Sequence, residues 1–251
     1  MEPMQALHLI EKTIRRAGTL LLDLAASPPE VLSSAGRDIK LQADRDSEKL
    51  IVDALRAESA WPILGEEGGE YGEGFEGRYW VIDPLDGTLN FSRGIPICCV
   101  SVALMEGTQP LAAAIYDFNR DEMFTAIARQ GAWLNGRPMY ASDRTDPAQG
   151  ALSTGFPSYT DFSTEALMPI IRRVQMFKKV RMIGSAAISL AWVACGRVDA
   201  YVEDDIMLWD VAAGMLLVRE AGGVVQLRES SKDKWARCIR TAGRVEMIEG
   251  V

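Results

Sequence analysis

The chain has 251 residues, of which 48% are hydrophobic and 25% are charged, so it holds enough apolar material for a large packed core. Its formal net charge is −8 and it has no block of lysines and arginines, which argues against a nucleic acid as its partner. Its apolar runs are shorter than the roughly 18 residues of a membrane-spanning helix, so we expect no membrane partner either.

The cysteines and the single histidine narrow the chemistry further. The four cysteines lack the CxxC spacing of zinc and redox motifs, so we expect reduced thiols in a cytoplasmic protein. His8 is the only histidine and falls in the first expected helix, which argues against a histidine-based zinc site or a Ser-His-Asp triad. The chemistry must therefore come from carboxylates, hydroxyls and bound metal ions.

The first half of the chain predicts two helices followed by a meander of strands. Apolar residues at three- and four-residue intervals predict a helix over residues 4–26. A polar loop from Ser33 to Asp38 then leads to a second helix that ends at Glu58, for which Asp44 and Ser47 are candidate N-caps. The remaining elements are a short strand over residues 62–64, an antiparallel meander over 97–105, 110–116 and 122–128, and a hairpin turn at Asn135-Gly136.

The second half of the chain alternates strands and helices. Residues 140–150 resemble a linker, so we place a boundary there between an N-terminal subdomain (1–140) and a C-terminal subdomain (150–251). The expected elements are strands over 152–154, 180–183 and 199–203, and helices over 164–177, 186–195 and 211–221, the last capped by Asp210. Such alternation is typical of a sheet covered by helices, so the expected fold class is α/β.

The most informative stretch is residues 79–91. An apolar run predicts a strand that ends at Asp83, Pro84 predicts a tight turn, and Gly87-Thr88 predicts a helix start after Asp86. Carboxylates this close repel one another unless a hard cation such as Mg²⁺ lies between them. The alternative is a simple turn in which the aspartates cap backbone amides.

Other acidic residues also follow expected strands or begin helices. Glu66 and Glu67 come directly after the strand over 62–64, and Asp210 begins the last long helix. If these ends converge with Asp83 and Asp86, they provide ligands for two Mg²⁺ ions about 3.5–4 Å apart. The helix starts at Gly87-Thr88 and Gly184-Ser185 offer backbone amides to a phosphate. The alternatives are an acidic loop at 66–67, a close-packed helix entry at 184–185 and a plain N-cap at 210.

Three motifs in this order resemble the signatures of the inositol monophosphatase family. Residues 80–91 (Trp-Val-Ile-Asp-Pro-Leu-Asp-Gly-Thr-Leu-Asn-Phe) are similar to its first signature. Residues 209–214 (Trp-Asp-Val-Ala-Ala-Gly), continuing to 220–223, are similar to its second, and residues 65–67 (Gly-Glu-Glu) to its upstream acidic motif. The resemblance covers nearly the whole chain. It implies a layered αβαβα sandwich of the inositol monophosphatase and fructose-1,6-bisphosphatase type, with the active site between the two subdomains.

The resemblance also implies a role for each site residue. It implies two Mg²⁺ ions, one held by Glu66, Asp83 and the Leu85 carbonyl and one by Asp83, Asp86 and Asp210, with a third, weaker ion on Glu66. It implies that Thr88 and Asp44, with Glu66, orient and deprotonate the attacking water. The implied substrate contacts are Asp86, Gly87, Thr88, Gly184, Ser185, Ala186, Glu203 and Asp210.

The substrate class that follows is a small phosphorylated sugar or cyclitol, with myo-inositol 1-phosphate as the first candidate. Asn90-Phe91 is typical of the inositol-phosphate branch of the family. Fructose 1,6-bisphosphate is the alternative substrate. Its second phosphate would bind at the loop after residue 157, with the basic residues of 172–181 as possible partners. The competing interpretation of those basic residues is a solvated helix face. Histidinol phosphate and 3′-nucleotides are further alternatives, and a non-catalytic cation-binding protein is the competing class. The resemblance also implies a lithium-sensitive homodimer.

Overall fold

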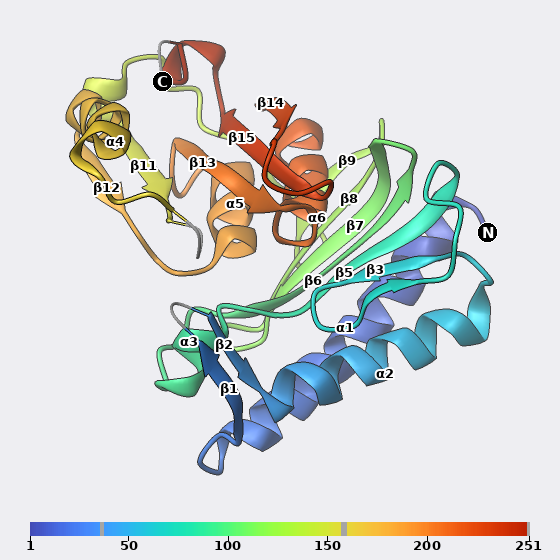
Figure 1. The fold of residues 1–251 in the computed structure, drawn as a ribbon. Coiled ribbons are helices and arrows are strands. Elements are labelled where there is room, and N and C mark those ends of the chain that lie inside the picture. The colour runs from blue at the N-terminus through green and yellow to red at the C-terminus, as the bar shows by residue number, and fades with distance from the viewer. Residues whose placement is uncertain (36–37, 157–159, 250–251) are drawn as a thin grey trace.

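Two helices from the start of the chain pack on one face of an eight-stranded sheet (Figure 1). The computed structural model describes residues 1–35, 38–156 and 160–249. Helix α1 (Pro3–Ala25) buries Leu7, Ile10 and Ile14 against this sheet, which confirms the first expected helix. The apolar side chains recur at helical spacing because only one face of α1 meets the core.

The segment between the first two helices differs from expectation. Strands β1 (Val31–Ala35) and β2 (Asp38–Leu41) form an antiparallel pair where a polar loop was expected, and residues 36–37 of that loop lie outside the described residues. Helix α2 (Gln42–Glu58) begins before both candidate caps. Asp44 lies inside the first turn, where its Oδ2 accepts a 2.6 Å hydrogen bond from the Leu41 amide.

The eight-stranded sheet contains the expected meander. Its strands in spatial order are β10 (Arg137–Pro138), β9 (Gly131–Leu134), β8 (Glu122–Ile127), β7 (Gln109–Asp117), β6 (Cys99–Glu106), β5 (Arg78–Asp86), β3 (Ile63–Gly65) and β4 (Gly69–Tyr71). Neighbours are antiparallel except β3 and β5. Asn135 and Gly136 have φ values of 49° and 75°, the left-handed pair that a two-residue hairpin requires.

Strand β5 runs past Asp83, where the sequence predicted its end. It continues through Pro84 and Leu85 to Asp86, with Asp83 opposite Ser101 and Asp86 opposite Cys99. Three steps along β5 therefore match two steps along β6, which is a β-bulge. A bulge accommodates the proline, which has no amide hydrogen for the ladder, without ending the strand.

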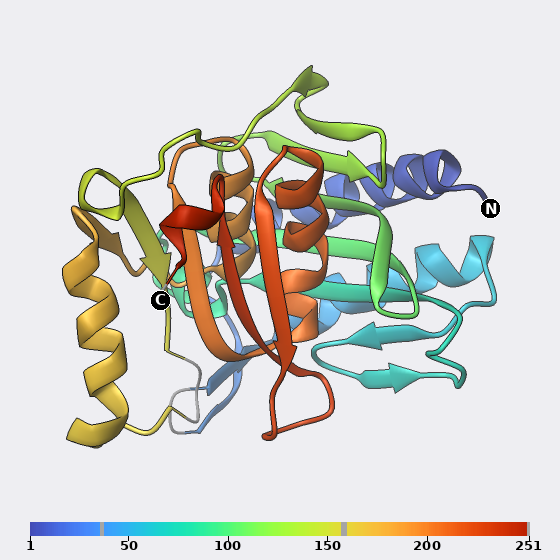
Figure 2. The same cartoon turned by 90° about the horizontal axis from the view of Figure 1, so that it is seen from above.

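The second sheet forms from residues that follow the linker. Its strands in spatial order are β12 (Lys179–Arg181), β11 (Ala151–Thr154), β13 (Ala200–Met207), β15 (Ala236–Ala242) and β14 (Val224–Glu229). The helices of this half are α4 (Thr164–Met176), α5 (Ala186–Ala194) and α6 (Leu208–Glu220). Figure 2 shows the five strands side by side, with α5 and α6 behind them and α4 at one end. Strand β13 runs four residues past its expected end. Helix α6 begins at Leu208, before its expected start, and Asp210 therefore lies in its first turn rather than at its cap.

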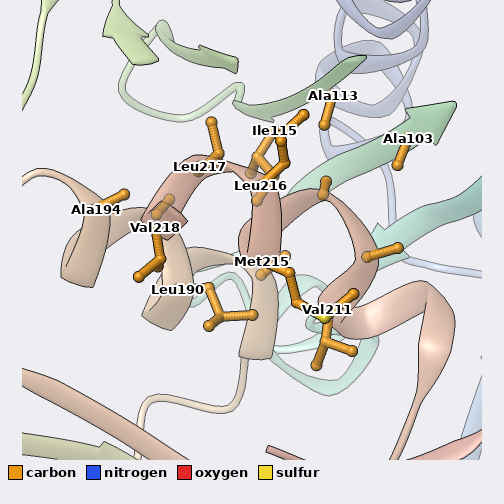
Figure 3. Packing of buried hydrophobic residues seen from close by; sticks show 14 of the residues in the cluster. Ala103, Ala113, Ile115, Leu190, Ala194, Val211, Met215, Leu216, Leu217 and Val218 are labelled. Carbon is orange, nitrogen blue, oxygen red and sulfur yellow. The ribbon is translucent and has the colours of Figure 1, made fainter. Parts of the chain in front are cut away.

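Helices α5 and α6 lie between the two sheets and join them into a layered α/β structure (Figure 1). Figure 3 shows Leu216 and Leu217 of α6 close to Ile115 of β7, and Met215 of α6 beside Leu190 of α5. Gly214 lets the two helices approach, because a Cβ at that position would overlap Leu190. Within the described ranges, no helix combines the length and the apolar character needed to cross a membrane.

Candidate active site

The β-bulge of β5 holds two carboxylates in fixed positions. Asp83 is fully buried, and its Oδ1 accepts a 3.0 Å hydrogen bond from the Leu85 amide. Its Oδ2 is buried and has no hydrogen-bond partner. Gly87 follows Asp86 with a φ of 92°, and a Cβ there would lie 2.8 Å from the Ile97 carbonyl oxygen. Only glycine permits this tight turn into α3 (Thr88–Ser92).

Three carboxylates converge at this point. One oxygen from each of Asp83, Asp86 and Asp210 lies within 4.8 Å of the others. Asp210 comes from the first turn of α6, where its Oδ2 accepts a 3.1 Å hydrogen bond from the Met207 amide. Burial, followed by the neighbouring negative charges, raises the pKa of Asp83 and of Asp210. Carboxylates that are costly to ionise together fit a hard divalent cation, which would neutralise them.

Glu66 joins this cluster from the loop after β3. Burial raises the pKa of Glu66, and the charge of Asp44 adds to the rise. The same Glu66 charge is the second largest cause of the raised pKa of Asp83. Its neighbour Glu67 has a different partner, because its Oε2 lies 3.1 Å from Lys40 Nζ. The two adjacent glutamates therefore have separate roles, and only Glu66 belongs to the carboxylate cluster.

Thr88 and Asp44 lie next to the cluster and contact each other. Thr88 Oγ1 is 3.1 Å from Asp44 Oδ1 and 3.1 Å from the Leu85 carbonyl oxygen. Burial raises the pKa of Asp44 to about 7, against the opposing hydrogen bonds from the Leu41 amide and Thr88. Asp44 is thus held in place by a helix terminus and accepts or releases a proton near neutral pH.

Asp86 binds the start of α5. The Ser185 hydroxyl and the Ala187 amide donate to Asp86 Oδ2 at 2.5 and 2.6 Å, and the Ala186 amide donates to Oδ1 at 3.3 Å. Two of the expected substrate contacts, Ser185 and Ala186, therefore already bind a carboxylate of the protein. The negative charge of Asp86 is favourable at this helix N-terminus.

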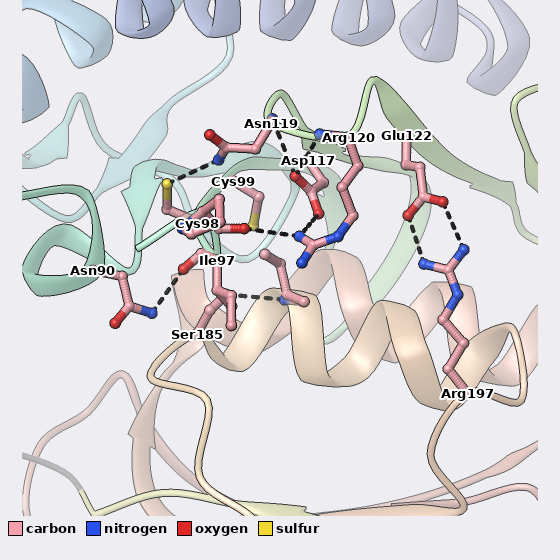
Figure 4. A network of polar contacts seen from close by, with 12 residues as sticks. Asn90, Ile97, Cys98, Cys99, Asp117, Asn119, Arg120, Glu122, Ser185 and Arg197 are labelled. Atoms are coloured by element: carbon pink, nitrogen blue, oxygen red, sulfur yellow. Dashed lines mark hydrogen bonds and ion pairs between the residues drawn. The ribbon is translucent and has the colours of Figure 1, made fainter. Parts of the chain in front are cut away.

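Asn90 fixes the loop that leads into α5. Its Nδ2 donates to the Ile97 carbonyl oxygen at 2.8 Å, close to Ser185 (Figure 4). It also donates to the Ile183 carbonyl oxygen at 2.7 Å. Phe91 is buried and meets Phe118 edge-on. Asn90 thus positions the site through hydrogen bonds and Phe91 through packing, and neither side chain lines the cavity described next.

A cavity of about 620 Å³ opens beside the cluster. The expected site residues that line it are Glu66, Asp86, Gly184, Ser185, Ala186, Glu203 and Asp210. Asp44, Asp83, Leu85, Gly87 and Thr88 are not among its lining residues; the first three are buried, and Gly87 and Thr88 are half-buried. Seven of the twelve expected site residues therefore line the cavity, and five do not.

The structure adds site residues that sequence reasoning missed. Tyr201 lines the cavity, and its hydroxyl donates a 2.7 Å hydrogen bond to Glu203 Oε2. Burial raises the pKa of Glu203 to about 7. Glu48 accepts hydrogen bonds from the Glu67 and Gly68 amides at 3.0 and 2.7 Å and so fixes the acidic loop. Its position, one helical turn after Asp44, was the available signal for Glu48.

The basic residues after position 171 divide into two groups. Arg173 is 7% exposed, and its Nη2 lies 3.3 Å from Asp204 Oδ2. The other members of the cluster, Arg172, Lys178, Lys179 and Arg181, are exposed, as on a solvated face. The nearby loop in which a second phosphate was expected includes residues 157–159, which lie outside the described residues.

The fold and the site together define a layered α/β protein with a buried carboxylate cluster where β5 meets α5 and α6. The chain belongs to the inositol monophosphatase family, whose profile matches residues 4–245. "Nus factor SuhB" from Xylella fastidiosa is 44% identical over 88% of this chain and 81% of its own length. "Inositol-1-monophosphatase" from Synechocystis is 35% identical over 90% of this chain and 79% of its own length. The crystal structure of the extragenic suppressor protein suhB from Bartonella henselae is 33% identical, with a TM-score of 0.87 over 98% of this chain and 96% of that one.

Proposed function

We propose that the protein hydrolyses small phosphate monoesters and requires Mg²⁺ to do so. The observation that carries the proposal is the convergence of Asp83, Asp86 and Asp210, with the buried Asp83 Oδ2 left without a partner. A buried carboxylate that lies close to two others and has one oxygen without a hydrogen-bond donor is costly unless a cation completes it. Membership of the inositol monophosphatase family supports the same reaction.

The residues that would hold the ions are those that the family resemblance implies. Glu66, Asp83 and the Leu85 carbonyl would hold the first Mg²⁺, and Asp83 would share the second with Asp86 and Asp210. Asp86 Oδ1 has only one hydrogen bond, of 3.3 Å, so it retains a lone pair for a cation. When bound, Mg²⁺ neutralises phosphate charge and lowers the pKa of a coordinated water.

The proton of the attacking water has a path through the protein. The Thr88 hydroxyl has one hydrogen, which it donates to Asp44 in this proposal, leaving a lone pair for the hydrogen of a water. As Thr88 Oγ1 takes the proton of the water, it passes its own hydrogen to Asp44, for which a pKa of about 7 suits Asp44. The Leu41 amide keeps the Asp44 carboxyl oriented. The amides of Gly87 and Thr88 would bind the phosphate oxygens.

The cavity wall favours a substrate rich in hydroxyl groups. Glu203 and Tyr201 form a buried polar pair on this wall, while Gly184 and Ala186 leave room for a ring. Glu203 accepts hydrogen bonds when ionised and donates one when protonated, so it recognises vicinal hydroxyls. We therefore place myo-inositol 1-phosphate first and fructose 1,6-bisphosphate second. A relative at 35% identity bears the name "Inositol-1-monophosphatase".

A panel of four phosphates tests the function directly. Inositol 1-phosphate, fructose 1,6-bisphosphate, histidinol phosphate and adenosine 3′,5′-bisphosphate are assayed for phosphate release with Mg²⁺, with and without Li⁺. We expect the highest kcat/KM for inositol 1-phosphate, and no release by the Asp83→Asn control. No release from any of the four by the wild-type protein would favour the competing class, a cation-binding protein without catalysis.

A second role is favoured by the names of other relatives. The relative from Xylella fastidiosa, at 44% identity, is named "Nus factor SuhB", which does not describe hydrolysis. We therefore place a binding role beside the catalytic one as the second candidate function. Asp83→Asn would separate the two roles, since we expect it to remove hydrolysis while the outer surface stays unchanged.

A homodimer is part of the proposal. Helix α4 exposes Met168, Ile171 and Val174, which recur at three-residue intervals on one face. Burial of such an apolar stripe between two copies would be favourable. Sedimentation of the wild-type protein and of Ile171→Glu tests this point, and we expect a dimer for the first and a monomer for the second.

A further inference from the structure

The buried face of α2 changes in character along the helix. Helix α2 packs against β5 (Figure 1), and its later turns bury apolar side chains that belong to the core of the first sheet. Its first two turns instead bury three polar side chains, Asp44, Ser47 and Glu48, at the three- and four-residue spacing of one helix face. Ser47 is fully buried, and Glu48 is 3% exposed. Buried polar groups need hydrogen-bond partners, and the partners of these three residues lie in three segments of the candidate active site.

Ser47 binds the β-bulge of β5. Its hydroxyl donates a 2.8 Å hydrogen bond to the carbonyl oxygen of Pro84, the residue between Asp83 and Leu85. The sequence predicted Ser47 as a candidate cap of α2, but the helix begins at Gln42, and the hydroxyl binds the strand instead. Ser47 therefore holds the backbone next to Asp83 against the helix.

Glu48 contacts the backbone on both sides of Glu66. The Glu67 and Gly68 amides donate to its Oε2 and Oε1 at 3.0 and 2.7 Å. On the other side of Glu66, a Cβ at Gly65 would lie only 2.7 Å from Glu48 Oε2. Glycine permits so close an approach because it has no side chain. One buried carboxylate thus fixes the acidic loop (residues 65–68) before and after Glu66.

The third residue of this face, Asp44, binds Thr88 at 3.1 Å. One helix therefore contacts the acidic loop, the β-bulge and the start of α3. The proposed first Mg²⁺ would draw Glu66 from the acidic loop and Asp83 from the bulge. Mg²⁺ requires nearly ideal octahedral geometry, so its affinity depends on how firmly these two segments are held relative to each other.

We propose that Ser47 and Glu48 are positioning residues that set the Mg²⁺ affinity of the site by holding the β-bulge and the acidic loop on one face of α2. The inference rests on the proposed function, because it concerns the same metal ions. Neither residue is an expected metal ligand. The Ser47 hydroxyl donates to the Pro84 carbonyl oxygen, and both carboxylate oxygens of Glu48 accept hydrogen bonds from the acidic loop.

The Mg²⁺ dependence of unfolding tests the proposal without turnover. The free energy of unfolding in urea is measured for the wild type, Ser47→Ala and Glu48→Gln over a series of Mg²⁺ concentrations, and its rise gives the apparent Kd for Mg²⁺. We expect each variant to raise this Kd by about ten- to a hundredfold, as removal of groups that orient metal ligands usually does. Ser47→Ala changes no charge, so a weaker affinity in that variant cannot result from a change in the electrostatic attraction of Mg²⁺.

Two control variants alter similar hydrogen bonds away from the site. Ser59→Ala removes a hydroxyl at the other end of α2, which accepts a 2.9 Å hydrogen bond from Trp80 Nε1 of the same strand β5. Glu220→Gln alters a carboxylate that holds the β8–β9 turn through the Arg129 and Gly131 amides at 2.8 and 2.9 Å. Both controls should lose stability and keep the wild-type Kd for Mg²⁺.

The possible results separate this inference from the proposed function. Unchanged Mg²⁺ affinity in Ser47→Ala or in Glu48→Gln, or an equal loss of affinity in the controls, would overturn the positioning role. The metal site itself would then stand, because the wild type still gains stability from Mg²⁺. A wild type that gains no stability from Mg²⁺ would contradict both the metal site and the positioning role.

Discussion

The hydroxyl of Ser185 donates a 2.5 Å hydrogen bond to Oδ2 of Asp86, which precedes it by 99 residues. The bond joins β5 of the first sheet to the start of α5. The Ala187 amide donates to the same oxygen at 2.6 Å. Burial raises the pKa of Asp86, and these hydrogen bonds oppose the rise. Asp86 thus connects the two halves of the chain and also belongs to the carboxylate cluster.

Ser185→Ala tests the contribution of this bond to stability. The Ser185 hydroxyl also accepts a 3.2 Å hydrogen bond from the Ile188 amide as the N-cap of α5. Loss of a cap together with a buried charged hydrogen bond should lower the free energy of unfolding by about 3 kcal/mol. Ser163→Ala, at the exposed N-cap of α4, removes a cap alone and should cost about 1 kcal/mol. Equal losses in urea denaturation would contradict a role for the Asp86 bond.

Thr88→Ala tests the proposed proton path. Removal of the hydroxyl 3.1 Å from Asp44 should lower kcat by about 10²–10⁴-fold, the usual contribution of general-base catalysis, and leave KM nearly unchanged. Thr88→Ser keeps the hydroxyl and should retain most of the activity. A change in KM alone would show that Thr88 binds the substrate without taking part in water activation.

The order of the elements could be predicted from the sequence because each long element has one dominant period. Helix α1 shows its apolar face, and β6 and β7 show continuous apolar runs between turn residues. Boundaries at the site could not be predicted in this way. The β-bulge depends on how β5 pairs with β6, and the early start of α6 depends on the Asp210 carboxylate accepting from the Met207 amide. The bulge is a tertiary feature with no local signal, whereas the Asp210–Met207 bond is local and shows that Asp210 binds the amide that precedes the helix instead of capping the helix itself.

Site residues were predictable where their position in the sequence is hard to reconcile with an ordinary structural role. Asp83 between a buried strand and a proline was such a case, and the structure brings it together with Asp86 and Asp210. Tyr201 could not be predicted in this way, because a tyrosine in an apolar strand is expected to be an ordinary core residue. Only the structure shows that its hydroxyl binds Glu203. The roles of these residues remain predictions that the variants decide.

Asp83→Asn tests whether the cluster binds Mg²⁺. Without metal, the variant should unfold at a higher temperature than the wild type at pH 8, because one buried and repelled charge is gone. With Mg²⁺ at 100 times its Kd, the wild type should gain about 2.7 kcal/mol of stability and the variant far less. Asp117→Asn is the control: Asp117 is buried but pairs with Arg120, so that variant should lose stability and keep the Mg²⁺ response. Equal Mg²⁺ responses in wild type and Asp83→Asn would exclude this metal site.

Glu203→Gln tests the buried acid of the cavity wall through the pH dependence of stability. Burial raises the pKa of Glu203 from its ordinary value of 4.5 to about 7, so the folded protein holds this proton over a range in which the unfolded chain has lost it. The wild type should therefore lose stability relative to the variant as the pH rises from about 4.5 to 7, and the difference should then stay constant. The difference between the two pKa values corresponds to a loss of stability on the order of 3 kcal/mol.

Glu122→Gln is the control of opposite sign, because Arg197 lowers the pKa of Glu122. The contribution of Glu122 to stability is therefore present above pH 4.5 and is lost as the pH falls. Urea denaturation of the metal-free proteins between pH 4 and 8 measures both differences. A pH-independent difference between wild type and Glu203→Gln would show that folding leaves the pKa of Glu203 at its ordinary value, so that Glu203 is ionised at neutral pH and meets the substrate as a hydrogen-bond acceptor only.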